Sequence, residues 1–268
     1  MKKFNAGNAE VQIYSSQIAL GAAAARRATS LICSAIEKRK RARIIVATGN
    51  SQISLANALV TEPIPWQAVD VFHMDEYVNI DANHPSSFRY WVRTRIKEKV
   101  SPGSVHYLNG DAPDLDSETR RYSVLLTQFP IDLAFVGFGE NGHIAFNDPG
   151  AADFNDPAVV KRVTLDDICR NQQTGEGHFK DLASVPQQAV TITCSGLFRA
   201  SSWICCVPEA RKASAVRNAL EGPISESCPA SIVRKHGNAV VYLDRESSSL
   251  LHAANRQMSS KADLSELR

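Results

Sequence analysis

Hydrophobic residues along this chain follow two spacings, one typical of helices and one typical of buried strands. Apolar positions recur every three or four residues in segments that we predict to be helices, at residues 16–38, 53–60, 85–100, 118–128 and 209–220. Short, nearly continuous apolar runs predict buried strands at residues 42–47, 69–73, 131–136, 188–193, 202–207 and 239–243. Because strands and helices alternate, the chain predicts βαβ units and an α/β fold with a mostly parallel sheet.

The chain shows no internal repeat and no linker rich in proline, glycine or serine. We therefore predict a single domain over residues 1–268. Residues 150–187 are polar and have few apolar anchors. Two compatible interpretations remain for this segment, a lid over a binding site within the domain and a surface excursion with short helices.

Polar and glycine residues follow several predicted strands. The candidates for binding or catalysis among them are Thr48, Gly49, Asn50, Ser51, Asp75, Gly137, His143 and Lys212. In open parallel sheets, ligands bind beyond the carboxyl ends of the strands. We therefore expect these residues to converge on one edge of the sheet.

Residues 137–150 read GFGENGHIAFNDPG and place His143 among glycines, asparagines and two carboxylates. Glycines allow sharp turns and close approach of the backbone to a ligand. In one interpretation His143 is a catalytic imidazole whose ring is oriented by Asp148 or Glu140. In the other it is a core histidine with a satisfied ring. The histidines show no spacing of metal ligands, so we expect no metal site.

Asp75 ends a predicted strand in FHMDEYV, next to apolar and aromatic residues. Such surroundings raise the pKa of a carboxyl group, which suits a general base. Alternatively, Asp75 or Glu76 caps the next turn. Successive strand residues point to opposite sides, so only one of these two carboxylates faces a site at the sheet edge.

Residues 48–51, TGNS, lie between a predicted strand and a predicted helix. Hydroxyls and backbone N–H groups at such a position bind anions, which suits a phosphate. A simple helix cap by Asn50 or Ser51 also fits. No GKS or GKT follows, so a nucleotide is not implied. Lys212 follows another strand, although a lysine in a helix is by default solvated.

The net charge of +2 gives no case for nucleic acid as a partner. No stretch approaches the roughly 18 apolar residues that a membrane span needs, so we expect no membrane partner. The six cysteines show no CxxC or zinc spacing. Reduced thiols and a cytoplasmic location are therefore expected.

The segments FHMDEYV, HPSSF at 84–88, LNGDAPD at 108–114 and GFGENGHIAFNDPG resemble the glucosamine-6-phosphate deaminase/isomerase family. The resemblance runs from Thr48 to Lys212. It implies a Rossmann-like, doubly wound α/β domain with helices on both faces of the sheet. It also implies a sugar phosphate partner, D-glucosamine 6-phosphate, which is converted to D-fructose 6-phosphate and ammonia without a metal or organic cofactor. Members commonly form oligomers, so a homo-oligomer is compatible with the resemblance.

By the same resemblance, His143 assists opening of the sugar ring and is held by Asp148 and Asn141. Asp75 moves a proton from C2 to C1 through an enediol-type intermediate. The phosphate is expected on Lys212 and on the loop formed by Thr48, Gly49, Asn50 and Ser51, with Gly137 beside it.

Three positions depart from the family pattern. Asn141 lies where Asp also occurs, and Asp148 lies where Glu is common. Many members place a lid arginine on the phosphate, whereas this chain has Gln172 and Gln173 there, with Arg170 nearby. Residues 151–160 lack clear counterparts of the basic allosteric residues of some members, so no allosteric activation is expected.

Two other functions remain open. A 6-phosphogluconolactonase has a similar fold and also places a histidine in a GxxGH loop, but the IAFNDP and MDEY sequences favour the deaminase. A non-enzymatic sugar-phosphate sensor is the third hypothesis, motivated by the unusual lid residues.

Overall fold

The computed structural model describes residues 1–252 and contains a large sheet of mostly parallel strands. The strand order is β1-β2-β11-β10-β7-β3-β4-β6. Every pairing in this sheet is parallel except that of β1 with β2. The bounds are β1 Lys2–Ala6, β2 Ala9–Ile13, β3 Ala42–Val46, β4 Val69–His73, β6 Ser104–His106, β7 Leu133–Val136, β10 Trp203–Val207 and β11 Ala239–Leu243. The predicted α/β class with a mostly parallel sheet is confirmed.

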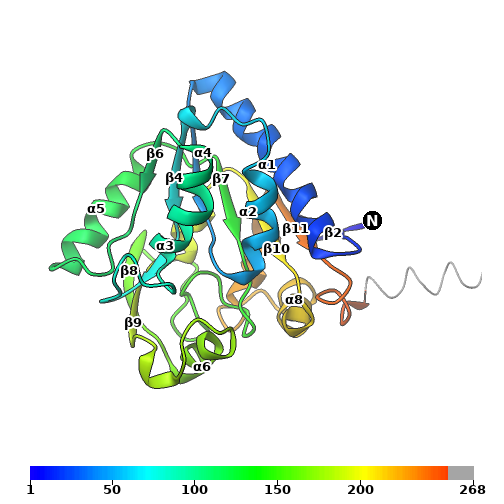
Figure 1. Cartoon of the computed structure of the whole chain (residues 1–268). Coiled ribbons are helices and arrows are strands. Elements are labelled where there is room, and N and C mark those ends of the chain that lie inside the picture. Colours follow the sequence, from blue (N-terminus) through cyan, green and yellow to red (C-terminus); the bar gives the residue numbers. More distant parts are fainter. Residues whose placement is uncertain (253–268) are drawn as a thin grey trace, which may run out of the picture.

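Helices cover both faces of this sheet (Figure 1). Ile44 of β3 packs in one hydrophobic cluster with residues of α1 and α2. The next residue, Ile45, points the other way and packs in a second cluster with residues of α5 and α8. The bounds are α1 Gln17–Arg39, α2 Ile53–Leu59, α3 Phe88–Val92, α4 Glu98–Val100, α5 Leu115–Thr127, α6 Asp167–Gly175, α7 Cys194–Phe198 and α8 Ala213–Glu221. The expected doubly wound, Rossmann-like arrangement is therefore present.

Local capping explains where several helices begin. The hydroxyl of Ser16 accepts a hydrogen bond from the backbone N–H of Ala19 and starts α1. The predicted helix at 85–100 begins only at Phe88, because Ser87 caps it and Pro85 lies in the preceding turn. A π-helical stretch at Arg93–Lys97 joins α3 to α4. The helix predicted at 118–128 begins three residues earlier, at Leu115, because Asp114 caps it.

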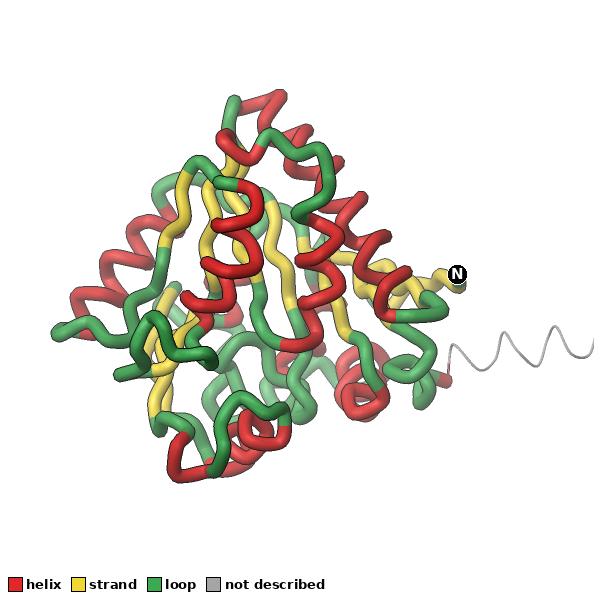
Figure 2. Tube along the Cα trace, viewed as in Figure 1, coloured by secondary structure: helices red, strands yellow, loops and turns green. Residues whose placement is uncertain are grey.

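A second, smaller sheet has the order β5-β9-β8 and is antiparallel. It contains β5 (Asp75–Tyr77), β8 (Val160–Thr164) and β9 (Gln188–Ile192). The strand predicted at 188–193 is present, but it belongs to this sheet instead of the parallel one. Helix α6 lies in the connection between β8 and β9, below the carboxyl ends of the parallel strands (Figure 2).

Two further points concern the chain ends and membranes. Strands β1 and β2 form an N-terminal hairpin that the hydrophobic pattern did not predict. The predicted domain extends to Arg268, and residues 253–268 lie outside the described part. Among residues 1–252, no helix combines the length and the apolar composition needed to cross a bilayer.

Candidate active site

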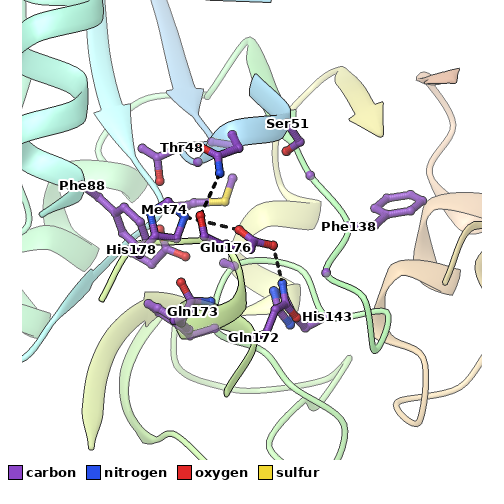
Figure 3. A pocket seen from close by; sticks show the side chains of 18 of the residues that line it. Thr48, Ser51, Met74, Phe88, Phe138, His143, Gln172, Gln173, Glu176 and His178 are labelled. Carbon is purple, nitrogen blue, oxygen red and sulfur yellow. Dashed lines mark hydrogen bonds and ion pairs between the residues drawn. The ribbon is translucent and has the colours of Figure 1, made fainter. Parts of the chain in front are cut away.

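One pocket lies at the carboxyl edge of the parallel sheet and collects residues from segments far apart in the sequence (Figure 3). Eight of the residues singled out from the sequence line it: Thr48, Gly49, Asn50, Ser51, Asp75, Gly137, His143 and Lys212. Asn141 and Asp148 are not among the residues that line the pocket, but both contact His143. The structure thus brings all ten residues together.

The imidazole of His143 is held by the turn in which it lies. The backbone N–H of Gly139 donates to the carbonyl oxygen of His143 at 2.9 Å, and that of Gly142 donates to the carbonyl oxygen of Gly139 at 3.0 Å. Gly142 has φ +88°, which favours glycine. The ring of His143 lies so close to the backbone of Gly139 that a Cβ there would overlap it. Both glycines are therefore needed to place the ring.

Asp148 and Asn141 set the surroundings of this ring. The Nδ1 atom of His143 lies 3.0 Å from Oδ1 of Asp148. The side-chain amide of Asn141 donates to the same oxygen at 2.8 Å, and its own oxygen accepts from the backbone N–H of His143 at 3.0 Å. Burial alone raises the pKa of Asp148, but the contacts with His143 and Asn141 outweigh it and hold that pKa below its ordinary value. Asp148 is therefore an anion beside the imidazole.

Glu140, the other carboxylate considered as a partner of His143, lies elsewhere. One of its oxygens is 3.6 Å from Nη1 of Arg211. Of the two open possibilities, Asp148 is therefore the carboxylate at the imidazole ring.

Asp75 begins the short strand β5 and lines the pocket. Burial raises the pKa of Asp75 well above its ordinary value, and the neighbouring carboxylate of Glu76 adds to this effect. His73 holds the backbone of Asp75, because its Nδ1 donates a hydrogen bond to the carbonyl oxygen of Asp75 at 2.9 Å. The Nε2 atom of His73 accepts from the backbone N–H of Leu108 at 2.9 Å. Burial lowers the pKa of His73 to about 3, so the ring stays neutral.

Glu76 points away from the pocket into a dense set of donors. Its carboxylate accepts from the hydroxyl of Ser87 at 2.7 Å and from the backbone N–H of Arg89 at 2.9 Å. The Nε of Arg89 lies 3.2 Å away and completes a buried ion pair. Glu76 is therefore structural, and Asp75 is the carboxylate of this pair that a ligand in the pocket would meet.

The loop at residues 48–51 makes a sharp turn into the pocket wall, with φ +91° at Gly49. The short 3₁₀ turn Asn50–Gln52 follows, and no side chain caps it or α2. The capping interpretation of Asn50 and Ser51 is therefore wrong. Gly137 packs against this loop, since a Cβ there would lie 3.4 Å from Oγ of Ser51.

Lys212 is buried at the end of the 3₁₀ turn Ala210–Lys212, with 3% of its surface exposed. Its default assignment as a solvated helix lysine is therefore wrong. Its Nζ lies 3.2 Å from Oε1 of Glu176, the residue that follows α6.

The pocket residues that were not singled out from the sequence as site residues include Phe88, Glu176, His178 and Arg211. A basic pair at 211–212 just after a strand was the only available signal for Arg211. Gln172 and Gln173 line the pocket where a lid arginine was expected. Arg170 does not replace that arginine, because its guanidinium donates to the carbonyl oxygens of Leu182 and Val185.

Within residues 1–252, no group of three or more His, Cys, Asp or Glu side chains is arranged to hold a metal ion. The pocket offers a buried carboxylate of raised pKa, a positioned imidazole and a cationic end. These groups are suited to proton transfer on a small anionic substrate.

Comparison with known proteins agrees with this geometry. A glucosamine-6-phosphate deaminase from Oenococcus oeni is 32% identical over 206 residues, which cover 77% of this chain and 85% of that protein. The solved structure of a monomeric glucosamine-6-phosphate deaminase has a TM-score of 0.83 at 29% identity and covers 90% of this chain and 99% of its own. A 6-phosphogluconolactonase from Shewanella baltica, with a TM-score of 0.72 at 18% identity over 87% of this chain and 97% of its own, shares the fold.

The family model described as glucosamine-6-phosphate isomerases/6-phosphogluconolactonase matches residues 15–242, nearly the whole described chain. Together with the deaminase relatives and the shared fold, this match shows that the chain belongs to the glucosamine-6-phosphate isomerase/6-phosphogluconolactonase family.

Proposed function

We propose that this protein is a glucosamine-6-phosphate deaminase, which converts D-glucosamine 6-phosphate and water to D-fructose 6-phosphate and ammonia. The observation that carries the proposal is the placement of Asp75, whose pKa is raised by burial, in one pocket with His143. A base and an imidazole from two separate elements suit an aldose–ketose isomerisation. Relatives named glucosamine-6-phosphate deaminase support the same activity.

His143 would assist opening of the pyranose ring by moving a proton between the ring oxygen and the C1 hydroxyl. Its ring is placed for this step by the backbone of Gly139 and by the carboxylate of Asp148. Asn141 would hold Asp148 through its side-chain amide and would not relay a proton itself.

Asp75 would then act on the open-chain sugar. Removal of the C2 proton gives an enolamine, and return of the proton to C1 leaves an imine at C2. Water hydrolyses this imine to the ketone and releases ammonia. A positioned base contributes roughly 10²–10⁴-fold to such a step. None of these steps calls for a metal or an organic cofactor.

The phosphate would bind at the other end of the pocket, to Thr48, Gly49, Asn50 and Ser51, beside Gly137 and with Lys212 as its cation. Binding energy from this remote group would position C1 and C2 against Asp75. Residues 150–187, within the single domain 1–268, would form a lid, since α6 contributes Gln172 and Gln173 to the pocket wall.

All groups named in this mechanism come from one chain. A homo-oligomer remains an expectation that light scattering would test. We also propose a cytoplasmic location, because the six cysteines at 33, 169, 194, 205, 206 and 228 are free thiols.

The direct test is to incubate the protein with D-glucosamine 6-phosphate and measure fructose 6-phosphate and ammonia in equal amounts. A second assay with 6-phosphogluconolactone measures hydrolysis under the same conditions. Deamination exceeding lactone hydrolysis is expected. Faster lactone hydrolysis would support the lactonase instead, and ligand-induced stabilisation without turnover of either compound would support a sensor.

A further inference from the structure

The cationic end of the pocket already holds an anion, the carboxylate of Glu176. This residue directly follows α6, and its Oε1 lies 3.2 Å from Nζ of Lys212 and 3.5 Å from Nη1 of Arg211. The side-chain amide of Gln172 donates to the same oxygen at 2.9 Å, and Nε2 of His178 lies 3.3 Å from the second oxygen. Figure 3 shows Glu176 between Gln172 and the loop of Thr48 and Ser51.

These contacts keep Glu176 ionised although it is largely buried. Burial alone would raise the pKa of Glu176, but His178, Lys212, Gln172 and Arg211 together lower it far below its ordinary value. The side chain is 10% exposed. The surrounding donors thus form a binding site for an oxyanion, and the carboxylate of Glu176 occupies it.

The backbone at Glu176 is also attached to the proposed phosphate loop. The side-chain amide of Asn50 donates to the carbonyl oxygen of Glu176 at 3.2 Å. Glu176 therefore links the end of α6 to the loop at 48–51 and to Lys212, the groups to which we assign the substrate phosphate.

A phosphate group cannot share this position with Glu176, since two anions at hydrogen-bonding distance from one lysine repel each other strongly in a buried site. Arg211 offers no surplus charge, because Nε lies 2.5 Å from a carboxylate oxygen of Glu209 and Nη1 lies 3.6 Å from one of Glu140. The incoming phosphate must therefore replace the carboxylate on Lys212.

We propose that Glu176 is a built-in competitor for the substrate phosphate, a latch that holds α6 across the empty site. The inference rests on the proposed phosphate site. A phosphate monoester carries about −1.5 to −2 charges and three acceptor oxygens, so it can replace a carboxylate that carries one charge. Phosphate binding then releases Glu176 and frees the end of α6 from Lys212. The cost of breaking the latch lowers the apparent affinity for the phosphate.

The test is calorimetric titration of the full chain with inorganic phosphate, which needs no turnover. Glu176→Gln keeps the size of the side chain and removes its charge, and it is expected to bind phosphate about tenfold more tightly than wild type. Glu176→Asp shortens the reach to Lys212 and is expected to fall between the two. Glu98→Gln is the matched control, because it makes the same change at an exposed carboxylate that lies outside the pocket, 3.8 Å from Nε of Arg93; its phosphate affinity should stay close to that of wild type.

Unchanged or weaker phosphate binding in Glu176→Gln would overturn the proposal, since Glu176 would then support the bound state. Absence of phosphate binding in every variant would overturn it as well. If Glu176→Gln fails to fold, Glu176→Asp carries the same comparison with wild type. If Glu176→Gln binds phosphate more tightly but the wild-type protein shows no deamination, the latch is supported and the proposed function is refuted. If the protein deaminates its substrate and Glu176→Gln has an unchanged phosphate affinity, only the latch is refuted.

Discussion

The imidazole ring of His143 packs on the backbone of Gly139, where the Cβ of any side chain would overlap the ring. The hydrogen bond from Gly139 N–H to the carbonyl oxygen of His143 closes the same turn. One glycine therefore fixes both the loop and the position of the ring beside Asp148.

We expect Gly139→Ala to lower kcat/KM for D-glucosamine 6-phosphate about 100-fold, because a displacement of the ring by about 1 Å is enough for a loss of that size. Steady-state kinetics measure the effect, and thermal unfolding checks that the variant is folded. Gly237→Ala is the control, since a Cβ there meets open space. Wild-type kinetics in a folded Gly139→Ala variant would contradict the placement of His143.

Asp75→Asn should remove the proposed base while keeping the shape of the side chain. Exchange of the C2 proton with solvent, followed by NMR in deuterated water, is expected to slow by roughly 10²–10⁴-fold. Binding of the product, measured by calorimetry, should be largely kept. Asp116→Asn, an exposed carboxylate in the first turn of α5, serves as the control. Undiminished exchange in Asp75→Asn would assign the base to another group.

Glu76→Gln should act on stability, because Glu76 balances the buried guanidinium of Arg89. Removing one partner of such a pair costs about 3 kcal/mol of unfolding free energy, which urea denaturation measures. Glu98→Gln breaks only an exposed contact with Arg93 at 3.8 Å and should change this free energy by less than about 1 kcal/mol. Equal effects of the two variants would refute the structural role of Glu76.

The pH profile of kcat/KM should report Asp75. A general base must be ionised, and the pKa of Asp75 is raised, so activity should increase with pH along a limb above the ordinary aspartate value of about 3.9. The substrate phosphate also titrates near pH 6. Glu76→Gln separates the two, because loss of the neighbouring carboxylate lowers the pKa of Asp75 and shifts only its limb downwards. A limb that stays in place in this variant would speak against Asp75.

Glu176 should contribute to stability in a pH-dependent way. Its pKa is lowered in the folded state, so below the unfolded value of about 4.3 the unfolded chain binds more protons and stability falls. Denaturation at pH 7, 5, 4 and 3 should show wild type losing more stability than Glu176→Gln as the pH drops. Parallel curves for the two proteins would mean that Glu176 is not held by Lys212.

The parallel sheet could be predicted because its strands are buried on both faces and read as continuous apolar runs, such as LAFV at 133–136. The hairpin of β1 and β2 carries polar residues at alternate positions and gives no such signal. The run at 188–193 looks like the others, and only its antiparallel pairing with Tyr77 and Val163 separates it from the main sheet.

Most of the site could be expected for a similar reason. Asp75, His143 and the loop at 48–51 each follow a parallel strand, so topology alone brings them to one edge. Glu176 and His178 lie in the connection between β8 and β9, which does not follow a parallel strand, so topology does not predict their positions. Their positions depend on how α6 packs. The burial of Lys212 likewise depends on Glu176, a partner 36 positions away in the sequence.

The antiparallel sheet carries the proposed base and the α6 segment on different strands. Asp75 lies on β5, whereas α6 lies in the connection between β8 and β9. Thr164 and Gln188 are paired neighbours at the ends of β8 and β9, so the connection that carries α6 leaves and returns at one point. Such an excursion can change in length or composition without moving Asp75 on the adjoining strand β5. Replacing residues 165–187 with the corresponding segment of a relative is therefore expected to change which ligands the phosphate site prefers. The groups that transfer protons would stay in place.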